Sequence, residues 1–230
     1  INHDVDKNNT GNSESSNMGT TTMLSMGHDQ VSVHAINQKY HGFFKINEYT
    51  LQHQQFSGQL THIFNREIFE RGDAVVVMPY DIARDKVLLI EQFRAGALNN
   101  TESPWLLEFI AGMFGVNESP EEVAIREAKE EANLNLSYQD LEPIITFYPS
   151  PGGTSEKLHL YLAKFDSSSV CSGEVYGLPE ENEDILLHLV SRTEAVNLLA
   201  QGKITNAATI IGLQWLAINH SAITERESKA

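Results

Sequence analysis

The chain has 230 residues, of which 41% are hydrophobic and 20% are charged, a composition typical of one large globular domain or of one domain with a small appendage. It carries 31 Asp and Glu against 16 Lys and Arg, a net charge of −15, which excludes nucleic acid and anionic membranes as partners because both need a basic surface. An acidic protein can still bind a phosphate-bearing small molecule when divalent cations bridge the two negative surfaces.

The sequence shows no sign of a membrane span or of secretion. No stretch approaches the ~18 apolar residues that a spanning helix needs, and the N-terminus lacks the residue order of a secretory signal. The single Cys171 excludes an internal disulfide. Together these features favour the reducing cytosol, and we expect a cytoplasmic protein.

The first third of the chain changes in character along its length. Residues 1–30 are rich in Asn, Ser, Thr and Gly, which predicts a disordered tail. From about Val31 to Glu70, β-leaning runs separated by the turn sequence SGQ predict a small antiparallel sheet. The apolar runs AVVVMPYD (74–81) and KVLLIEQFR (86–94) predict strands of a sheet that is buried on both faces.

The next segment, SPEEVAIREAKEEANL, has helix signals at both ends. Ser119 can cap the helix, Pro120 suits its first position, and Glu122 completes a capping box. Asn133 stands where the chain leaves the helix in a left-handed conformation, which Gly favours most and Asn next. We therefore predict a helix between Ser119 and Asn133.

The last third predicts further strands in PIITFYPS, KLHLYLAKF and ILLHLVSR. A second helix begins after Ser191, with Glu194 completing its capping box, and ends at Gly202. A third, NAATIIGLQWLAINH, has one broad apolar face and packs on the sheet. We expect residues 223–230 to form a C-terminal tail. The fold class is mixed α and β, with a sheet covered by helices.

The sequence REAKEE places several carboxylates on one face of the predicted helix. Residues three and four apart share a face, so Glu127, Glu130 and Glu131 project together. Arg126 can pair with Glu130, and we expect this face to pack against nothing apolar. Two carboxylates about 4 Å apart repel by ~4 kcal/mol at an effective dielectric of 20, so a closed cleft needs a cation between them. Oxygen ligands select Mg²⁺ or Mn²⁺, although a solvated acidic face is the common alternative for this motif alone.

The spacing of residues around this helix distinguishes a cation site from a solvated acidic face. From Gly112 the chain fits G-x5-E-x7-R-E-U-x-E-E-x-G-U, where U is apolar, and chance gives such a match with a probability of ~10⁻⁵ over a chain of this length. The matched residues are Gly112, Glu118, Arg126, Glu127, Glu130 and Glu131, with Ala128 and Leu134 at apolar positions. This pattern is the Nudix box, and the chain resembles a Nudix hydrolase. Asn133 replaces the usual Gly, and we expect the loop–helix–loop shape to survive because Asn tolerates the left-handed conformation.

The resemblance continues outside the box. From about Tyr40 to His220, stretches such as REIFERGDAVVVMPYD, LLIEQFRAGAL, SPWLLEFIAGM and SPGGTSE look like the bacterial ADP-ribose pyrophosphatase branch. Pro151 plays the part of the proline that marks this branch, whereas Tyr148 is the type of residue that dinucleoside polyphosphate hydrolases carry there. The resemblance implies Mg²⁺-dependent hydrolysis of ADP-ribose to AMP and ribose 5-phosphate, with Mn²⁺ as a substitute.

The same resemblance implies a domain organisation and an assembly. It implies a Nudix α/β/α sandwich with a mixed sheet over residues 73–222 and a small N-terminal antiparallel β-sheet over residues 31–72. In this branch two subunits exchange the N-terminal sheet, so we expect a homodimer.

The resemblance also assigns roles to single residues. The implied metal ligands are Glu127, Glu131, the carbonyl of Ala111, Glu130 as ligand or orienting group, and Glu183. The general base falls in LPEENEDI and is placed at Glu181, with Glu180, Glu183 and Asp184 as neighbouring choices. Arg126 braces the helix carboxylates, and Glu118 is a structural residue at the helix start.

Substrate contacts follow from the same comparison. Arg94 resembles a phosphate-contacting arginine at the end of a strand, and Glu156 is a candidate for contacting metal or substrate. Phe43 and the partner subunit's Arg66 sandwich adenine in this branch, although a core Phe and a surface Arg are the ordinary alternatives.

Two alternative functions remain open from the sequence. One is a Nudix hydrolase of other nucleoside diphosphate derivatives, such as ADP-sugars, GDP-sugars or dinucleoside polyphosphates. The other is a non-catalytic module that binds ADP-ribose, which predicts loss of box carboxylates, whereas here all of them are present.

Overall fold

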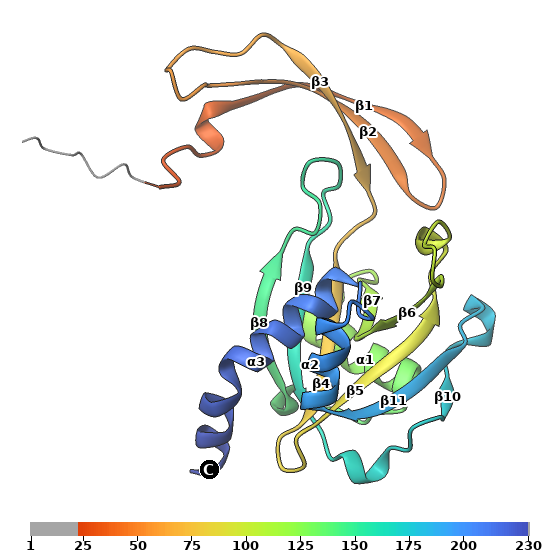
Figure 1. Ribbon diagram of the computed structural model, residues 1–230. Helices are drawn as coiled ribbons and strands as arrows, with labels where there is room; N and C mark the ends of the chain where they lie inside the picture. Colours follow the sequence, from red (N-terminus) through yellow and green to blue (C-terminus); the bar gives the residue numbers. More distant parts are fainter. Residues whose placement is uncertain (1–22, 230) are drawn as a thin grey trace, which may run out of the picture.

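A computed structural model describes residues 23–229 of the chain (Figure 1). It contains a three-stranded sheet and an eight-stranded sheet, together with three α-helices. The mixed α and β class is confirmed. Most of the predicted N-terminal tail, residues 1–22, lies outside the described residues, and His28–Gln30 form a 3-10 turn that leads into the first strand.

The N-terminal sheet is antiparallel, as predicted, and arches over one end of the larger sheet (Figure 1). Its strands are β1 (Val31–His41), β2 (Lys45–His53) and β3 (Phe64–Glu70), in the order β1-β2-β3. Every residue of β1 is exposed, including the apolar Val33 and Ile36. The end of β3 rests on a loop of the main body, because Phe69 exchanges backbone hydrogen bonds with Gly153 and Ser155.

The large sheet has the strand order β10-β11-β5-β4-β9-β8, with β6 paired to β5 and β7 paired to β4. It is mixed, because β4 runs parallel to β9 and antiparallel to β5 and β7. The strands are β4 (Ala74–Asp81), β5 (Lys86–Phe93), β6 (Trp105–Glu108), β7 (Ile110–Met113), β8 (Leu141–Phe147), β9 (Leu158–Lys164), β10 (Val175–Tyr176) and β11 (Ile185–Ser191). The short strands β6, β7 and β10 were not predicted.

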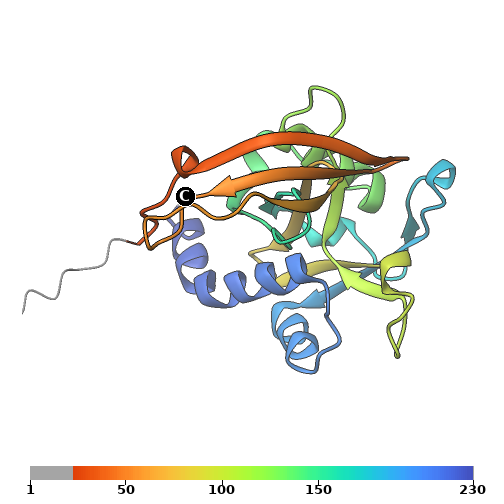
Figure 2. The same cartoon turned by 90° about the horizontal axis from the view of Figure 1, so that it is seen from above.

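Helices cover both faces of this sheet (Figure 2). They are α1 (Pro120–Ala132) on one side and α2 (Arg192–Ala200) with α3 (Ala207–Glu227) on the other. Strand β5 alternates between the two layers: Leu88 packs in the α1 core, and Leu89 packs in the α3 core. None of the described helices combines the length and the apolar character needed to cross a bilayer.

The ends of α1 agree with the sequence signals, and Ser191 caps α2 by accepting from the Glu194 N–H, without the return bond of the predicted capping box. Ser119 Oγ accepts from the Glu122 backbone N–H at 3.3 Å, and Glu122 Oε2 accepts from the Ser119 N–H at 2.7 Å. Asn133 is left-handed at φ 52° and ψ 25°. Helix α3, however, runs on to Glu227, so the segment expected to be a tail is largely helical. Ile223 explains the difference, because it continues the buried face of α3 and is only 2% exposed.

A buried carboxylate fixes the turn at the end of β4. Asp81 is 2% exposed and accepts hydrogen bonds from the Ser167 N–H and Oγ and from the Arg84 N–H and guanidinium, at 2.6 to 3.0 Å. Burial alone would raise the pKa of Asp81, but these donors outweigh it and lower the pKa to about 2. The folded state therefore holds Asp81 ionised more strongly than the unfolded chain does.

We expect Asp81→Asn to destabilise the fold by about 2–3 kcal/mol at pH 7, because an amide NH₂ would face donors where an oxygen now accepts. The folded pKa lies below the unfolded value, so this stabilisation is present above about pH 4 and is lost as the pH falls towards 2. Urea unfolding at pH 7 and pH 3 measures it, with the exposed Asp29→Asn as control. Equal stability of Asp81→Asn and wild type at pH 7 would contradict the prediction.

Candidate active site

A cavity of 1190 Å³ lies where the β7–α1 loop, the end of β5, the Leu178–Glu183 loop and the hairpin of the N-terminal sheet meet. It is large enough for a nucleotide-sized ligand. Its lining includes three arginines and seven glutamates: Arg71, Arg94 and Arg126, with Glu108, Glu118, Glu127, Glu130, Glu156, Glu181 and Glu183. Because the carboxylates outnumber the guanidinium groups, a phosphate-bearing ligand needs additional positive charge in this cavity.

The loop before α1 brings its backbone very close to the helix. A Cβ added at Gly112 would lie 1.7 Å from Glu127 Oε1 and 2.3 Å from its Cγ. Gly112 is not among the residues with positive φ, so the close approach of the Glu127 side chain, rather than a turn, requires glycine. The sequence pattern therefore fixes the distance between strand β7 and the carboxylate face of α1.

Two carboxylates of α1, Glu127 and Glu131, are buried beside strand β7. Glu131 is 2% exposed and Glu127 is 9% exposed. Glu131 Oε2 accepts a hydrogen bond from the Ala111 N–H at 3.0 Å. Burial raises the pKa of Glu131 well above its ordinary value, and burial raises the pKa of Glu127 to about 7 although the Arg126 charge opposes it. Both shifts show that this face favours an additional positive charge.

Arg126 braces the helix carboxylates, as the resemblance implies. Its Nε donates to Glu118 at 3.0 Å, and its Nη1 donates to Glu127 at 2.7 Å and to Glu130 at 3.1 Å. Its Nη2 also donates to the Met113 carbonyl at 3.2 Å. With the side chains in these positions, no group of three His, Cys, Asp or Glu in residues 23–229 is spaced to hold an ion. Arg126 occupies one oxygen of Glu127 and one of Glu130 and leaves the second oxygen of each for other partners.

The oxygen donors around Ala111 fit a hard divalent cation. The Ala111 N–H points at Glu131, and the N–H and C=O of a strand residue point to the same side of the strand. The Ala111 carbonyl therefore faces α1 and not β4. A carbonyl with the neighbouring carboxylates of Glu127 and Glu131 forms an oxygen-only donor set, which Mg²⁺ and Mn²⁺ prefer.

The loop after β10 places two of the candidate glutamates at the cavity. Glu183 Oε2 accepts from the Leu178 N–H at 3.2 Å, which closes the base of the loop. Gly177 has φ 112° and lies against the Cβ of Glu183, so a side chain there would collide. Glu181 is exposed at the tip of the loop. Glu181 and Glu183 both line the cavity, whereas Glu180 and Asp184 do not, which favours the first two among the acids left open by the sequence.

Arg94 follows β5 directly, in the position predicted from the sequence, and lines the cavity. Its Nε donates to Glu108 Oε2 at 2.9 Å, and its Nη2 forms an ion pair with the same oxygen at 2.8 Å. Glu108 is 3% exposed and was missed. The available signal was a single acid within the apolar run WLLEFI.

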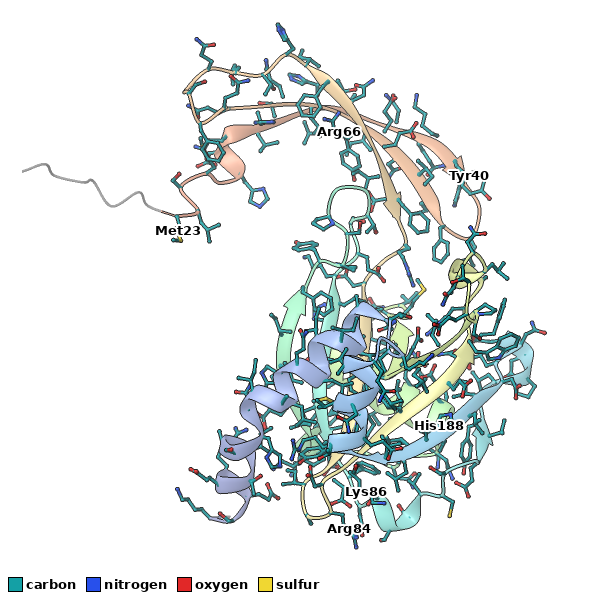
Figure 3. The ribbon with its side chains drawn as sticks, viewed as in Figure 1. Met23, Tyr40, Arg66, Arg84, Lys86 and His188 are labelled. Carbon is teal, nitrogen blue, oxygen red and sulfur yellow. The ribbon has the colours of Figure 1, made fainter. Side chains whose placement is uncertain are left out.

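The residues expected to sandwich adenine do not meet within one chain. Phe43 lines the cavity and is 87% exposed. Arg66 lies on the arching sheet (Figure 3), where its guanidinium packs over the Phe64 ring at 4.6 Å, and it does not line this cavity. Within one chain, Phe43 and Arg66 therefore do not form a common binding site.

Arg71 is a second cavity residue that the sequence reasoning missed. Its guanidinium lies 5.6 Å from the Phe44 ring centroid, and its Nε lies 3.3 Å from Glu156 Oε1. Arg71 Nε is buried without a hydrogen-bond partner. Glu156, which the sequence did single out, is therefore one side of an ion pair at the cavity wall.

Comparisons with known proteins agree with this geometry. The chain is 46% identical over 200 residues to the ADP-ribose pyrophosphatase of Escherichia coli (strain K12), covering 87% of this chain and 94% of that protein. It is 40% identical over 189 residues to the ADP-ribose pyrophosphatase of Haemophilus influenzae, covering 81% and 85%. It is 32% identical over 178 residues to the GDP-mannose pyrophosphatase of Yersinia enterocolitica, covering 77% and 90%.

A crystal structure of an ADP compounds hydrolase matches with a TM-score of 0.60 at 20% identity, covering 84% of this chain and 95% of that chain, and supports the fold alone. The family model described as NUDIX domain matches residues 70–211, which is more than half of the chain and includes β4, the box and most of the cavity lining. With the box folded as loop, helix and loop around buried carboxylates, the chain belongs to the NUDIX domain family.

Proposed function

We propose that this protein hydrolyses the diphosphate bond of ADP-ribose and releases AMP and ribose 5-phosphate, with Mg²⁺ as cofactor and Mn²⁺ as a substitute. The observation that carries the proposal is the pair of buried carboxylates, Glu127 and Glu131, beside the Ala111 backbone, with Glu127 and Ala111 in the lining of a nucleotide-sized cavity. The substrate is supported by the relatives named ADP-ribose pyrophosphatase, which are more similar to this chain than the GDP-mannose enzyme reported above.

The main candidate site residues have separate parts in the proposed reaction. A water oxygen bonds to one phosphorus, the P–O bond to the bridging oxygen breaks, and the water proton passes to Glu181 as general base. Arg94 binds the diphosphate oxygens with a charge-assisted hydrogen bond. The metal ligands are Glu127, Glu131 and the Ala111 carbonyl, with Glu130 and Glu183 as further ligands or orienting groups. Bound Mg²⁺ supplies neutralisation of the diphosphate charge and a more acidic water.

Purified protein tests the proposal directly. With Mg²⁺ and ADP-ribose we expect AMP and ribose 5-phosphate in equal amounts, measured by chromatography, and no products when the metal is chelated. ADP-ribose that remains intact would contradict the substrate assignment, and tight ADP-ribose binding without turnover would instead indicate a binding module.

A second candidate substrate is a GDP-sugar, because the chain is also 32% identical to a GDP-mannose pyrophosphatase. Parallel kcat/KM measurements on ADP-ribose, ADP-glucose, GDP-mannose and a dinucleoside polyphosphate separate the candidates. We expect ADP-ribose to give the highest value.

The contact between Gly112 and Glu127 gives a test of the box geometry. Gly112→Ala places a methyl group where the Glu127 carboxylate lies, so this side chain must adopt another rotamer. We expect turnover to fall at least ~30-fold because a metal ligand is displaced by more than ~1 Å. We expect a stability loss of only about 1–2 kcal/mol, because a flexible side chain moves.

Gly27→Ala is the matched control, since its added Cβ would meet only an ordinary contact at 3.6 Å. Initial rates and thermal unfolding of both variants measure the two effects. Gly112→Ala with wild-type turnover would show that Glu127 is not needed where it stands.

We also propose a homodimer in which the two subunits exchange their N-terminal sheets. Strand β1 is exposed along its whole length, and its apolar Val33 and Ile36 are each 55% exposed. Apolar residues concentrated on one exposed strand favour coverage by another chain. The exchange brings Arg66 of the partner subunit towards Phe43, where a guanidinium and an aromatic ring would enclose adenine.

Mixing two inactive variants tests the exchange. Arg66→Ala lacks only the adenine contact and Glu131→Gln lacks only a metal ligand, so a hybrid dimer with exchanged arginines contains one intact site. We expect activity to return to about a quarter of the wild-type value after subunit mixing at equal concentrations, because half of the dimers are hybrids with one site each. No recovery, although ultracentrifugation shows hybrid dimers, would place Arg66 and Glu131 in the same subunit's site.

A further inference from the structure

Glu108 is a buried carboxylate that touches the cavity and the start of α3 at the same time. Its Oε2 accepts the hydrogen bond from Arg94 Nε, pairs with Arg94 Nη2, and accepts a longer hydrogen bond from Gln92 Nε2 at 3.4 Å. Its Oε1 accepts from Asn206 Nδ2 at 3.0 Å. A carboxylate that is only 3% exposed and is bound from both sides has a fixed orientation.

Asn206 in turn is held by the first turn of α3. Its Oδ1 accepts from the Thr209 N–H and from Thr209 Oγ, both at 3.0 Å, so Asn206 caps the helix. Thr209 is fully buried, and its Oγ accepts from the Phe109 N–H at 3.0 Å. Phe109 separates β6 from β7, where the chain changes partner from β5 to β4. One turn further along α3, a Cβ on Gly212 would come within 2.7 Å of the Phe109 ring.

The contact with Glu108 leaves one edge of Arg94 free. The guanidinium is planar and carries five N–H donors, and the Nε and Nη2 edge is bound to Glu108. The contacts with Glu108 do not involve Nη1 of Arg94, and the side chain is 41% exposed and lines the cavity. A planar group that is held along one edge presents its other edge in a single direction.

We infer that Glu108 is a positioning residue: it holds the Arg94 guanidinium so that the free edge faces the diphosphate, and Asn206 holds Glu108 in place from the start of α3. The inference rests on the proposed role of Arg94 in binding diphosphate. It adds a group outside the Nudix box, and it gives α3 a part in substrate affinity.

A double-mutant cycle on the binding of ADP tests the inference. Calorimetry with ADP and Mg²⁺ compares wild type, Glu108→Gln, Arg94→Gln and the double variant. We expect each single substitution to weaken ADP binding about tenfold, and the double variant to bind no more weakly than Arg94→Gln alone. Effects that multiply to about a hundredfold would overturn the inference, because Glu108 would then act independently of Arg94.

Asn206→Ser provides a second variant that spares the fold. Serine is a good N-cap residue, so the α3 cap is retained while the donor to Glu108 is lost. We expect ADP binding to weaken about threefold in the wild-type background and to be unchanged in the Arg94→Gln background. An equal loss in both backgrounds would overturn the link through Glu108.

Glu102→Gln is the control, because Glu102 lies on the nearby surface, where it pairs with Lys203 and is 69% exposed. This variant should bind ADP like wild type. In steady-state hydrolysis, Glu108→Gln should raise KM with little change in kcat, whereas a purely structural loss would lower the melting temperature and the active fraction together. A wild-type protein that binds ADP but leaves ADP-ribose intact defeats the proposed function, while the binding cycle still decides the role of Glu108.

Discussion

Glu131→Gln is expected to lower Mg²⁺-dependent hydrolysis of ADP-ribose by about 10³-fold while the fold stays intact. The substitution removes a negative oxygen from the donor set beside Ala111. The amide oxygen of Gln can still accept the Ala111 N–H, and no space changes. Because the substitution also removes a buried charge, the variant should melt at the same temperature as metal-free wild type or above it.

Two measurements check this expectation. Calorimetry should detect Mg²⁺ uptake by wild type and much weaker uptake by the variant, and Mg²⁺ should raise the melting temperature of wild type only. Glu194→Gln, an exposed acid near the start of α2, is the matched control and should behave as wild type. Near-normal turnover, or an unfolded variant, would contradict the role given to Glu131.

Glu181→Gln is expected to lower kcat by about 10²–10⁴-fold, the usual range for the loss of a general base. Glu181 is exposed at the tip of its loop, so its substitution should leave both the melting temperature and Mg²⁺ uptake unchanged. This result distinguishes it from Glu131→Gln, which loses metal as well as rate.

The neighbouring Glu180→Gln is a closely matched control, since it changes the charge by the same amount one residue away and does not line the cavity. Single-turnover rates with saturating Mg²⁺ compare the two variants. A larger loss in Glu180→Gln than in Glu181→Gln would move the base by one residue.

The sequence predicted those parts of the fold that depend on local pattern. The apolar run of residues 74–81 forms β4 with the same bounds. Helix α1 begins after the capping box of Ser119 and Glu122 and ends at the left-handed Asn133, as expected. These features depend on backbone preferences and on contacts within a few residues. Strand β10 was missed because two residues carry no periodicity.

The cavity residues reached from the sequence are those of the box and those that the family resemblance supplied, such as Phe43, Arg94 and Glu181. The contact between Glu108 and Asn206 joins residues 98 positions apart, and no local pattern indicates it. The depth at which Glu131 is buried was likewise not predictable, because it depends on strand β7, whose Ala111 N–H donates to this carboxylate from 20 positions away. Arg71 was missed because its contacts with Phe44 and Glu156 are made in the folded protein and no local pattern indicates them.

In the proposed homodimer, the short connection between the two sheets would link quaternary structure to substrate affinity. Only residues 71–73 separate β3 from β4, and Arg71 in that connection lines the cavity, while the neighbouring Phe69 is bonded to the loop that leads to Glu156. A chain whose N-terminal strands dissociate from a second subunit would therefore loosen the wall of its own nucleotide pocket. Dilution below the dimerisation constant would then raise KM before any residue of the box is disturbed.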